Sequence, residues 1–183
     1  MNSAFGFPLK LPLRGKQPKI TIITTSSQWV PTVGCRYFVV EIMGASGGGV
    51  YNRGNNSGGG IGGYGLKIFS PPFLSSYTVT VGAAGTRTPT ASTAGGTSSF
   101  TSSFTVNGGG GATADCCSDH PGAAAAAGTG GDINMPGLVN GFGTLVKVYP
   151  FNAFADYGWS LSTGSTTQGA GETQGAVMVT EFF

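Results

Sequence analysis

The sequence predicts an all-β domain, and three observations support this fold class. Short segments of alternating apolar and polar residues, rich in Val, Ile, Thr, Tyr and Phe, recur along the chain, as is typical of half-buried strands. Glycine runs separate these segments, and 34 of the 183 residues are glycine. No segment has the length and apolar spacing of a three-turn helix. The alanines at 123–127 are too few for one and are expected to be extended.

The N-terminal part of the chain is predicted to be an arm. Three prolines within residues 1–19 remove backbone donors and disfavour helix before them, so this segment is expected to be extended, with residues 20–183 forming one folded domain. Alternation then predicts a strand at 20–24, a turn at 26–28 and a long strand at 35–43.

The remaining strands follow the same reasoning. They are expected at residues 66–69, 77–81, 97–100, 104–106, 145–149 and 176–183. Short strands joined by long loops favour antiparallel sheets packed as a sandwich or a jelly roll. On the faces that should point inward, the residues expected to be buried are Phe38, Val40, Ile42, Val79, Val81, Val177 and Val179.

The glycine runs predict an unusual packing between the strands. Loops of this length are uncommon in a compact domain. Left-handed extended helices with three residues per turn leave their backbone groups pointing outward, and without side chains several can lie side by side and bond to one another. We therefore expect packed polyglycine II-type helices. Collagen is excluded because the chain lacks a strict Gly-X-Y period.

Charge is scarce and unevenly placed. Charged residues make up 9% of the chain, against a usual quarter, and the net charge of +2 does not indicate direct nucleic-acid binding. The chain shows no membrane-spanning stretch and no signal peptide. Four basic residues lie within residues 1–19, well before the first acid, Glu41, and indicate either an arm that reaches an acidic partner or a solvated tail. They are Lys10, Arg14, Lys16 and Lys19.

No set of residues predicts catalysis. Cys116, Cys117, Asp119 and His120 lie close together in what is expected to be an exposed loop; a Cys-His nucleophile or a soft-metal site is the alternative. No orienting group accompanies them, and the spacing matches no metal motif. The glycine runs lack the Lys-Ser/Thr and following helix of a phosphate loop. We expect no enzyme activity, no cofactor and no metal. The three cysteines are interpreted as free thiols, with a vicinal disulfide as the alternative.

Two further clusters allow two interpretations each. Asp132 and Asn134 suit either a turn held by side-chain to backbone bonds or part of a calcium shell. The aromatic residues of 149–159 suit either core or subunit contact, or a platform for carbohydrate. They are Tyr149, Phe151, Phe154, Tyr157 and Trp159.

Several segments in order resemble the glycine-rich domain found in bacteriophage tail fibres and other virion proteins. They are residues 24–31 leading into 41–49, then 58–64, 77–85, 95–100, 130–137 and 175–183. The resemblance implies a virion structural protein at the particle surface, such as a tail-fibre tip or a spike, that contributes to host attachment. It also implies assembly in the host cytoplasm, a homotrimer, and partners among other virion proteins and the carbohydrate or protein of the host surface.

The alternative is a minor capsid or decoration protein that stabilises the shell through its arm, residues 1–19. In the first interpretation, recognition is assigned to the glycine-rich loops 44–63, 82–96 and 108–131, because loops on a rigid scaffold commonly carry recognition. The residues expected to contact a receptor are Tyr51, Arg53, Asn55, Asn56 and Tyr64.

Overall fold

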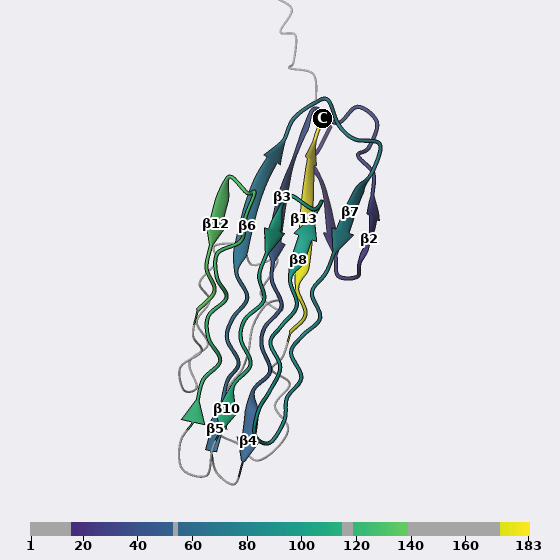
Figure 1. Cartoon of the computed structure of the whole chain (residues 1–183). Helices are drawn as coiled ribbons and strands as arrows, with labels where there is room; N and C mark the ends of the chain where they lie inside the picture. The colour runs from purple at the N-terminus through teal and green to yellow at the C-terminus, as the bar shows by residue number, and fades with distance from the viewer. Residues whose placement is uncertain (1–15, 53–54, 115–118, 139–172) are drawn as a thin grey trace, which may run out of the picture.

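The computed structural model describes residues 16–52, 55–114, 119–138 and 173–183, and nine of its strands form two antiparallel sheets (Figure 1). The five-stranded sheet has the order β1 (Lys19–Ile23), β13 (Ala176–Phe182), β3 (Tyr37–Met43), β6 (Tyr64–Phe69) and β12 (Ile133–Met135). The four-stranded sheet has the order β2 (Ser27–Trp29), β7 (Tyr77–Thr80), β8 (Ser98–Phe100) and β9 (Thr105–Val106). The described residues contain no helix, so the all-β prediction is confirmed.

Strand β3 is the centre of the five-stranded sheet. It pairs with β13 from Tyr37 opposite Phe182 to Met43 opposite Ala176, and with β6 on its other side. Because successive side chains of a strand point to opposite faces, Phe38, Val40 and Ile42 all face the second sheet. All three are fully buried, as the alternation predicts.

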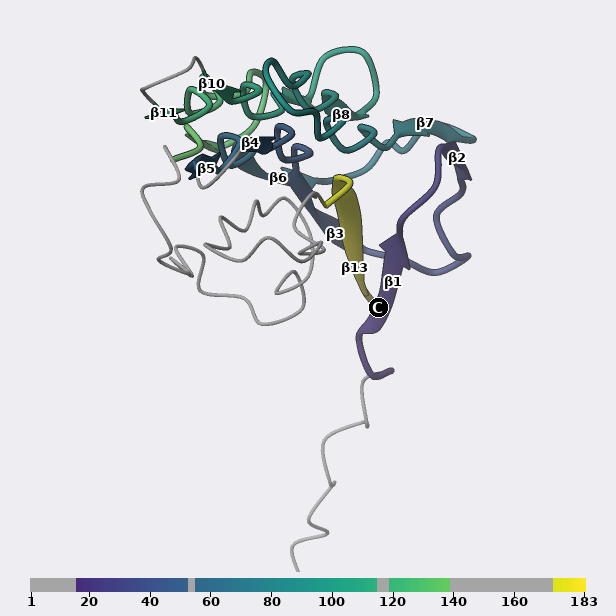
Figure 2. The ribbon, with the colours of Figure 1, turned by 90° about the horizontal axis from the view of Figure 1, so that it is seen from below.

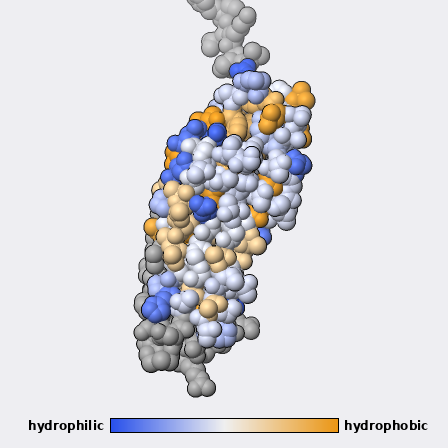
Figure 3. Space-filling model, in the orientation of Figure 1, coloured by the Kyte–Doolittle hydropathy of each residue, from blue (hydrophilic) through white to orange (hydrophobic). Residues whose placement is uncertain are grey.

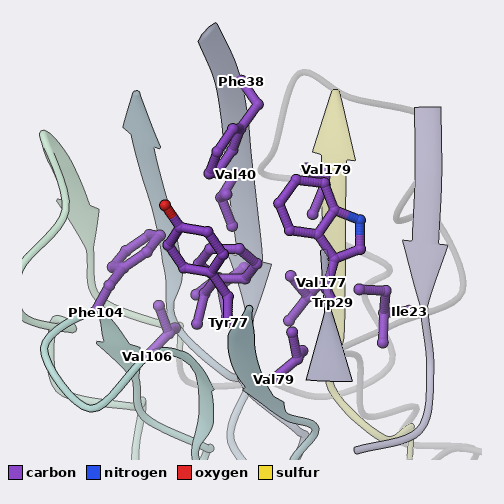
Figure 4. Close-up of a cluster of buried hydrophobic side chains, with 12 residues drawn as sticks. Ile23, Trp29, Phe38, Val40, Tyr77, Val79, Phe104, Val106, Val177 and Val179 are labelled. Atoms are coloured by element: carbon purple, nitrogen blue, oxygen red, sulfur yellow. The ribbon is translucent and has the colours of Figure 1, made fainter. Parts of the chain in front are cut away.

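The hydrophobic core lies between the two sheets (Figure 4). Trp29 of β2 sits against Phe38 of β3 with ring centroids 4.8 Å apart, in the edge-to-face arrangement that aromatic pairs favour. The core cluster consists of Ile23, Trp29, Phe38, Val40, Ile42, Tyr77, Val79, Phe100, Phe104, Val106, Val177 and Val179. Of the residues expected to be buried, only Val81 differs, because it packs against the edge of this cluster and is partly exposed.

Below the sheets, the glycine runs form a second region, which we call the polyglycine bundle. Its segments run side by side as wavy lines in Figure 1 and as coils seen end-on in Figure 2. We define it by residues 44–49, 58–63, 82–86, 92–96, 107–112 and 122–126, with 173–175 alongside. Residues 44–49 and 58–63 are buried throughout.

Hydrogen bonds in the polyglycine bundle repeat every three residues. The amides of segment 44–49 donate in turn to three different neighbours, and the fourth and fifth return to the first and second neighbours. These bonds are Gly44 to Gly63 (3.0 Å), Ala45 to Gly96 (3.2 Å), Ser46 to Thr173 (2.9 Å), Gly47 to Gly60 (2.9 Å) and Gly48 to Thr93 (2.9 Å). Three residues per turn is the period of the polyglycine II type of helix, so the predicted packing is confirmed.

Close backbone approach explains why these segments are glycine. A Cβ built on Gly47 would lie 1.9 Å from the carbonyl oxygen of Gly110, and one on Gly109 would lie 1.9 Å from that of Gly60. Neither position has room for an added carbon atom. The neighbouring atoms belong to the backbone, which cannot move aside as the end of a flexible side chain could. The alanines at 123–127 belong to the same region, as predicted: the Ala125 amide donates to the carbonyl of Ile61 (3.2 Å).

Four details of the expected elements differ or lie outside the described residues. The turn expected at 26–28 is wrong, because Ser27–Trp29 form β2 and pair with β7. Strand β1 starts at Lys19, inside the expected arm. Strand β12 was expected only as a turn. The strand expected at 145–149 lies outside the described residues, as do residues 1–15 of the arm.

Candidate recognition tip

At the end away from the C-terminus, the polyglycine bundle closes in three turns that lie together (Figure 1). The first is the hairpin of β4 (Val50–Asn52) and β5 (Asn55–Ser57), and the second is the hairpin of β10 (Thr113–Ala114) and β11 (Asp119–His120). The third is the turn at residues 86–92. We call these three turns the recognition tip.

A small apolar cluster fixes the hairpins to the bundle. Val50 and Ala112 are both buried and pack together at the level where the bundle ends. The Ala112 amide donates to the carbonyl of Gly48 (2.9 Å), so β10 continues directly from a bundle segment. Isolated bridges join the three turns, with Val50 opposite Thr88 and Ala91 opposite Thr113. The tip is therefore joined to the bundle by backbone bonds and apolar packing.

Hydroxyl side chains hold the turn at 86–92 in shape. The Thr86 amide donates to the hydroxyl of Thr93 at 2.7 Å, and the Ala91 amide to that of Thr88 at 3.1 Å. The hydroxyl of Ser92 donates to the Gly49 carbonyl at 2.5 Å and ties this turn to the first hairpin. Local bonds of this kind let Ser and Thr replace missing backbone partners in turns.

The surface of the tip is polar, and Arg87 on the turn at 86–92 is partly exposed. Exposed positions include Pro89 and Thr90 on the turn, Thr113 on β10 and His120 on β11. An exposed histidine and hydroxyls can donate and accept hydrogen bonds. The arrangement suits polar recognition, since backbone pairing and hydroxyl bonds set the shape of the tip while its exposed side chains point outward.

The structure places the predicted receptor residues in two locations. Tyr51 lies on β4, and Asn55 and Asn56 lie on β5, so the backbone brings these three to the recognition tip. Arg53 lies outside the described residues. Tyr64 lies elsewhere, because it begins β6 and is buried, with its hydroxyl donating to the Glu41 carboxylate at 2.5 Å. Tyr64 is therefore not part of the exposed surface of the recognition tip.

Most of the glycine-rich loops named in the sequence analysis are bundle rather than loop. Within 44–63, 82–96 and 108–131, many positions pack against neighbouring bundle segments and are buried, so they cannot contact a receptor. The turns at their ends, and exposed bundle positions such as Thr93 and Ala126, are left to carry contacts. Sequence alone does not distinguish bundle from turn, because a glycine run has the same composition in a packed polyglycine helix and in a turn.

The predicted arm residues also divide. Lys10 and Arg14 lie outside the described residues, whereas Lys16 and Lys19 contact their own domain. The Lys16 ammonium lies 5.3 Å from the ring centroid of Phe183, and Lys19 pairs with Glu181 at 3.3 Å. The arm is thus tethered to the domain by its last residues.

The candidate chemical groups offer no assembled centre in the described part of the chain. Asp119 and His120 pair with Ala114 and Thr113 on the neighbouring strand, while Cys116 and Cys117 lie outside the described residues. Among described residues, no group of three His, Cys, Asp or Glu side chains gathers to hold a metal ion. Burial raises the pKa of the Cys35 thiol, which disfavours the reactive thiolate there.

Asn134 itself lies on β12, but its side chain and that of Asp132 bond to backbone and hold the turn ahead of the strand, as the turn interpretation predicts. Asn134 donates from Nδ2 to the Gly131 carbonyl (2.8 Å) and accepts from the Gly131 amide at Oδ1 (3.3 Å). Asp132 accepts from the Ile68 amide at Oδ2 (2.8 Å) and so fastens the turn to β6. The aromatic residues of 149–159, together with their two interpretations, lie outside the described residues.

Two buried carboxylates were missed by sequence reasoning. Glu41 lies on the outer face of β3 near Met43 and Met178, and burial raises its pKa while the hydrogen bond from Tyr64 opposes the shift. Glu181 is fully buried near the end of β13. Alternation places the Glu41 side chain on the face of β3 that points away from the core, where exposure is expected. For Glu181, no local sequence pattern indicates which residues are its partners.

A shallow hollow of about 520 Å³ lies on the outer side of the four-stranded sheet. Its lining is uncharged and mostly hydroxyl-bearing, with Thr78 and Thr80 from β7, Ser99 from β8 and Thr101 in the turn that follows. Leu74 and Tyr77 supply its apolar part.

The fold and the tip define an all-β domain in which a short sandwich is extended by a polyglycine bundle that ends in turns. The family model of the glycine-rich domain matches residues 21–180, and the chain belongs to that family. Comparison with curated proteins finds no match. In the described residues, no helix is long and apolar enough to cross a membrane.

Proposed function

We propose that this chain is a structural protein of a virus particle, exposed at the particle surface as a tail-fibre tip or spike, and that the recognition tip contacts the host. One observation carries the proposal. The three turns of the tip meet at one end of a hydrogen-bonded bundle, and the C-terminus and the start of β1 lie at the other end (Figure 1). A protein with opposite attachment and recognition ends suits a particle-borne adhesin.

The family supports the proposal in two ways. The glycine-rich domain covers nearly the whole folded part of the chain. The ordered segments quoted above resemble that domain as it occurs in phage tail fibres and other virion proteins. Under this proposal the chain assembles in the host cytoplasm, has no enzyme activity, and forms a homotrimer. A monomer by light scattering at micromolar concentration contradicts the trimer.

Mutation of the tip tests the proposal directly. Thr90→Lys and His120→Ala change exposed groups of the tip, and Thr80→Ala, at an exposed position of the four-stranded sheet, is the control. We expect the tip variants to reduce binding of purified protein to host cells by about tenfold each, the scale of a well-placed contact, and the control to bind normally. Normal binding by both tip variants overturns the proposal.

Treatment of the host cells separates the two classes of receptor. Loss of binding after periodate oxidation of surface glycans identifies carbohydrate, and loss after mild proteolysis identifies protein. The second candidate function, a decoration protein, is favoured by the basic residues ahead of Glu41. It gains support over the first if purified protein binds no host cell and particles lacking the chain are less stable to heat.

A further inference from the structure

The end of the sandwich opposite the recognition tip exposes apolar side chains. Val33 and Val30, in the loop between β2 and β3, have 93% and 59% of their surface exposed. Figure 3 shows hydrophobic residues, in orange, gathered at the upper end of the visible face, whereas the bundle below is paler. Grouped exposed apolar residues commonly mark an interaction site.

The same end of the sandwich is basic, and its nearby acid, Glu181, is buried and already paired. Lys16 and Arg36 are exposed. Glu181 is fully buried, and its carboxylate is bound by Thr32 and by Lys19. An approaching partner therefore meets positive charge that no exposed acid of these described segments neutralises.

Direct contacts join the three chain segments into one surface. The Lys16 ammonium lies over the Phe183 ring, and the Arg36 amide donates to the Phe182 carbonyl at 2.8 Å. Tyr37 and Phe182 stack with ring centroids 4.5 Å apart and planes within 8°. We call this the docking surface and define it by Lys16, Val30, Val33, Arg36 and Phe183.

We propose that the docking surface binds a virion protein partner that presents acidic side chains around an apolar patch. Charge complementarity favours the acids, and the exposed valines require an apolar counterpart. A nucleic acid would satisfy the charges but would leave Val33 without an apolar contact, which argues for a protein. The inference rests on the proposed function, because it names the partner class at the end of the molecule away from the host.

A binding assay on particles tests the proposal. The probe is purified particles assembled without this chain, to which full-length protein is added and co-sedimented. The variants are Lys16→Glu combined with Arg36→Glu, and Val33→Asp; the control is Thr90→Glu at the recognition tip. We expect each docking variant to bind the particles about tenfold more weakly, with unchanged thermal unfolding, and binding of wild type to weaken as salt is raised. Unchanged binding by both variants overturns the proposal.

A photo-crosslinking residue at position 33 identifies the partner. We expect a crosslink to another virion protein through a segment rich in Asp or Glu. A crosslink to nucleic acid, or loss of binding on nuclease treatment, overturns the proposal, as does a crosslink to a second copy of this chain in solution. Host-cell adhesion of the docking variants is measured in parallel. If wild-type protein docks on particles but adheres to no cell, the proposed function fails while the docking surface stands.

Discussion

Thr32 and Glu181 are 149 residues apart in the sequence and are joined by two hydrogen bonds. The Thr32 amide donates to Oε1 at 2.6 Å and its hydroxyl to Oε2 at 3.0 Å. The loop after β2 is thereby fixed to the end of β13, which shapes the docking surface.

This relationship predicts that Glu181→Ala destabilises the domain. The substitution leaves the partly buried Thr32 amide without its acceptor, and since a fully buried unsatisfied donor costs about 1–3 kcal/mol, a loss near the lower end of that range is expected. Lys19→Ala removes the cation beside the buried Glu181 carboxylate but leaves both bonds from Thr32 in place, so it is expected to cost less than Glu181→Ala. Urea denaturation measures both. Equal losses would show that the ion pair, and not the bond to Thr32, carries the effect.

The polyglycine bundle predicts that Gly47→Ala prevents normal packing. Its added carbon would overlap the Gly110 carbonyl, and backbone on both sides is held by the bundle bonds. We expect a loss of about 3 kcal/mol or more in the free energy of unfolding, at or above the upper range for overpacked cores. Ala126→Ser, at an exposed position of the same region, is the control. A Gly47→Ala protein as stable as wild type would refute the packing described for this segment.

The core predicts a strong dependence on Phe38. This ring is fully buried and contacts Trp29, Phe69 and Tyr77, with centroid distances of 4.8, 4.9 and 5.4 Å. Phe38→Ala is expected to lower the free energy of unfolding by about 3–5 kcal/mol. Ile68→Ala, on the exposed face of the neighbouring strand, should change it little. Calorimetry that found similar midpoints for the two variants would contradict this assignment of the core.

Glu41 predicts a specific dependence of stability on pH. Burial raises its pKa in the folded protein, so between the unfolded and folded pKa values the native state holds more protons than the unfolded state. The stability contribution of Glu41 therefore falls as pH rises through that window. We expect Glu41→Gln to be more stable than wild type at neutral pH, with the difference shrinking in acid below the ordinary pKa of Glu, about 4.3. A difference that does not change with pH would contradict it.

The strands and the core could be largely predicted from the sequence, because alternation is a local signal. Phe38, Val40 and Ile42 alternate with other residues over the length of one strand, and burial follows from the pleat. The polyglycine packing could also be predicted, since few other arrangements use so many side-chain-free residues. Strand β2 could not be, because Ser27 and Gln28 carry no apolar signal and their pairing with β7 is set by Trp29 entering the core.

The candidate site was harder to predict, because it depends on where the bundle ends. Tyr51 and Tyr64 each lie just after a glycine run. Tyr51 nevertheless lies on a tip hairpin, whereas Tyr64 is buried on β6 beside Glu41. What separates them is the number of helical turns between each residue and the sheet. That number depends on contacts between distant segments, which a single sequence does not reveal.

The three-residue period of the bundle has a consequence for how such chains can change in length. Within residues 44–49 or 58–63, removal of one or two residues rotates every following amide by a third or two thirds of a turn, away from its acceptor. Removal of three shortens the segment by one whole turn and restores each direction. The turn at 86–92 has no three-residue repeat, because side-chain hydroxyls rather than a regular series of backbone bonds hold it. Insertions and deletions inherited by relatives of this chain are therefore expected in multiples of three codons along the bundle and in any number at the tip.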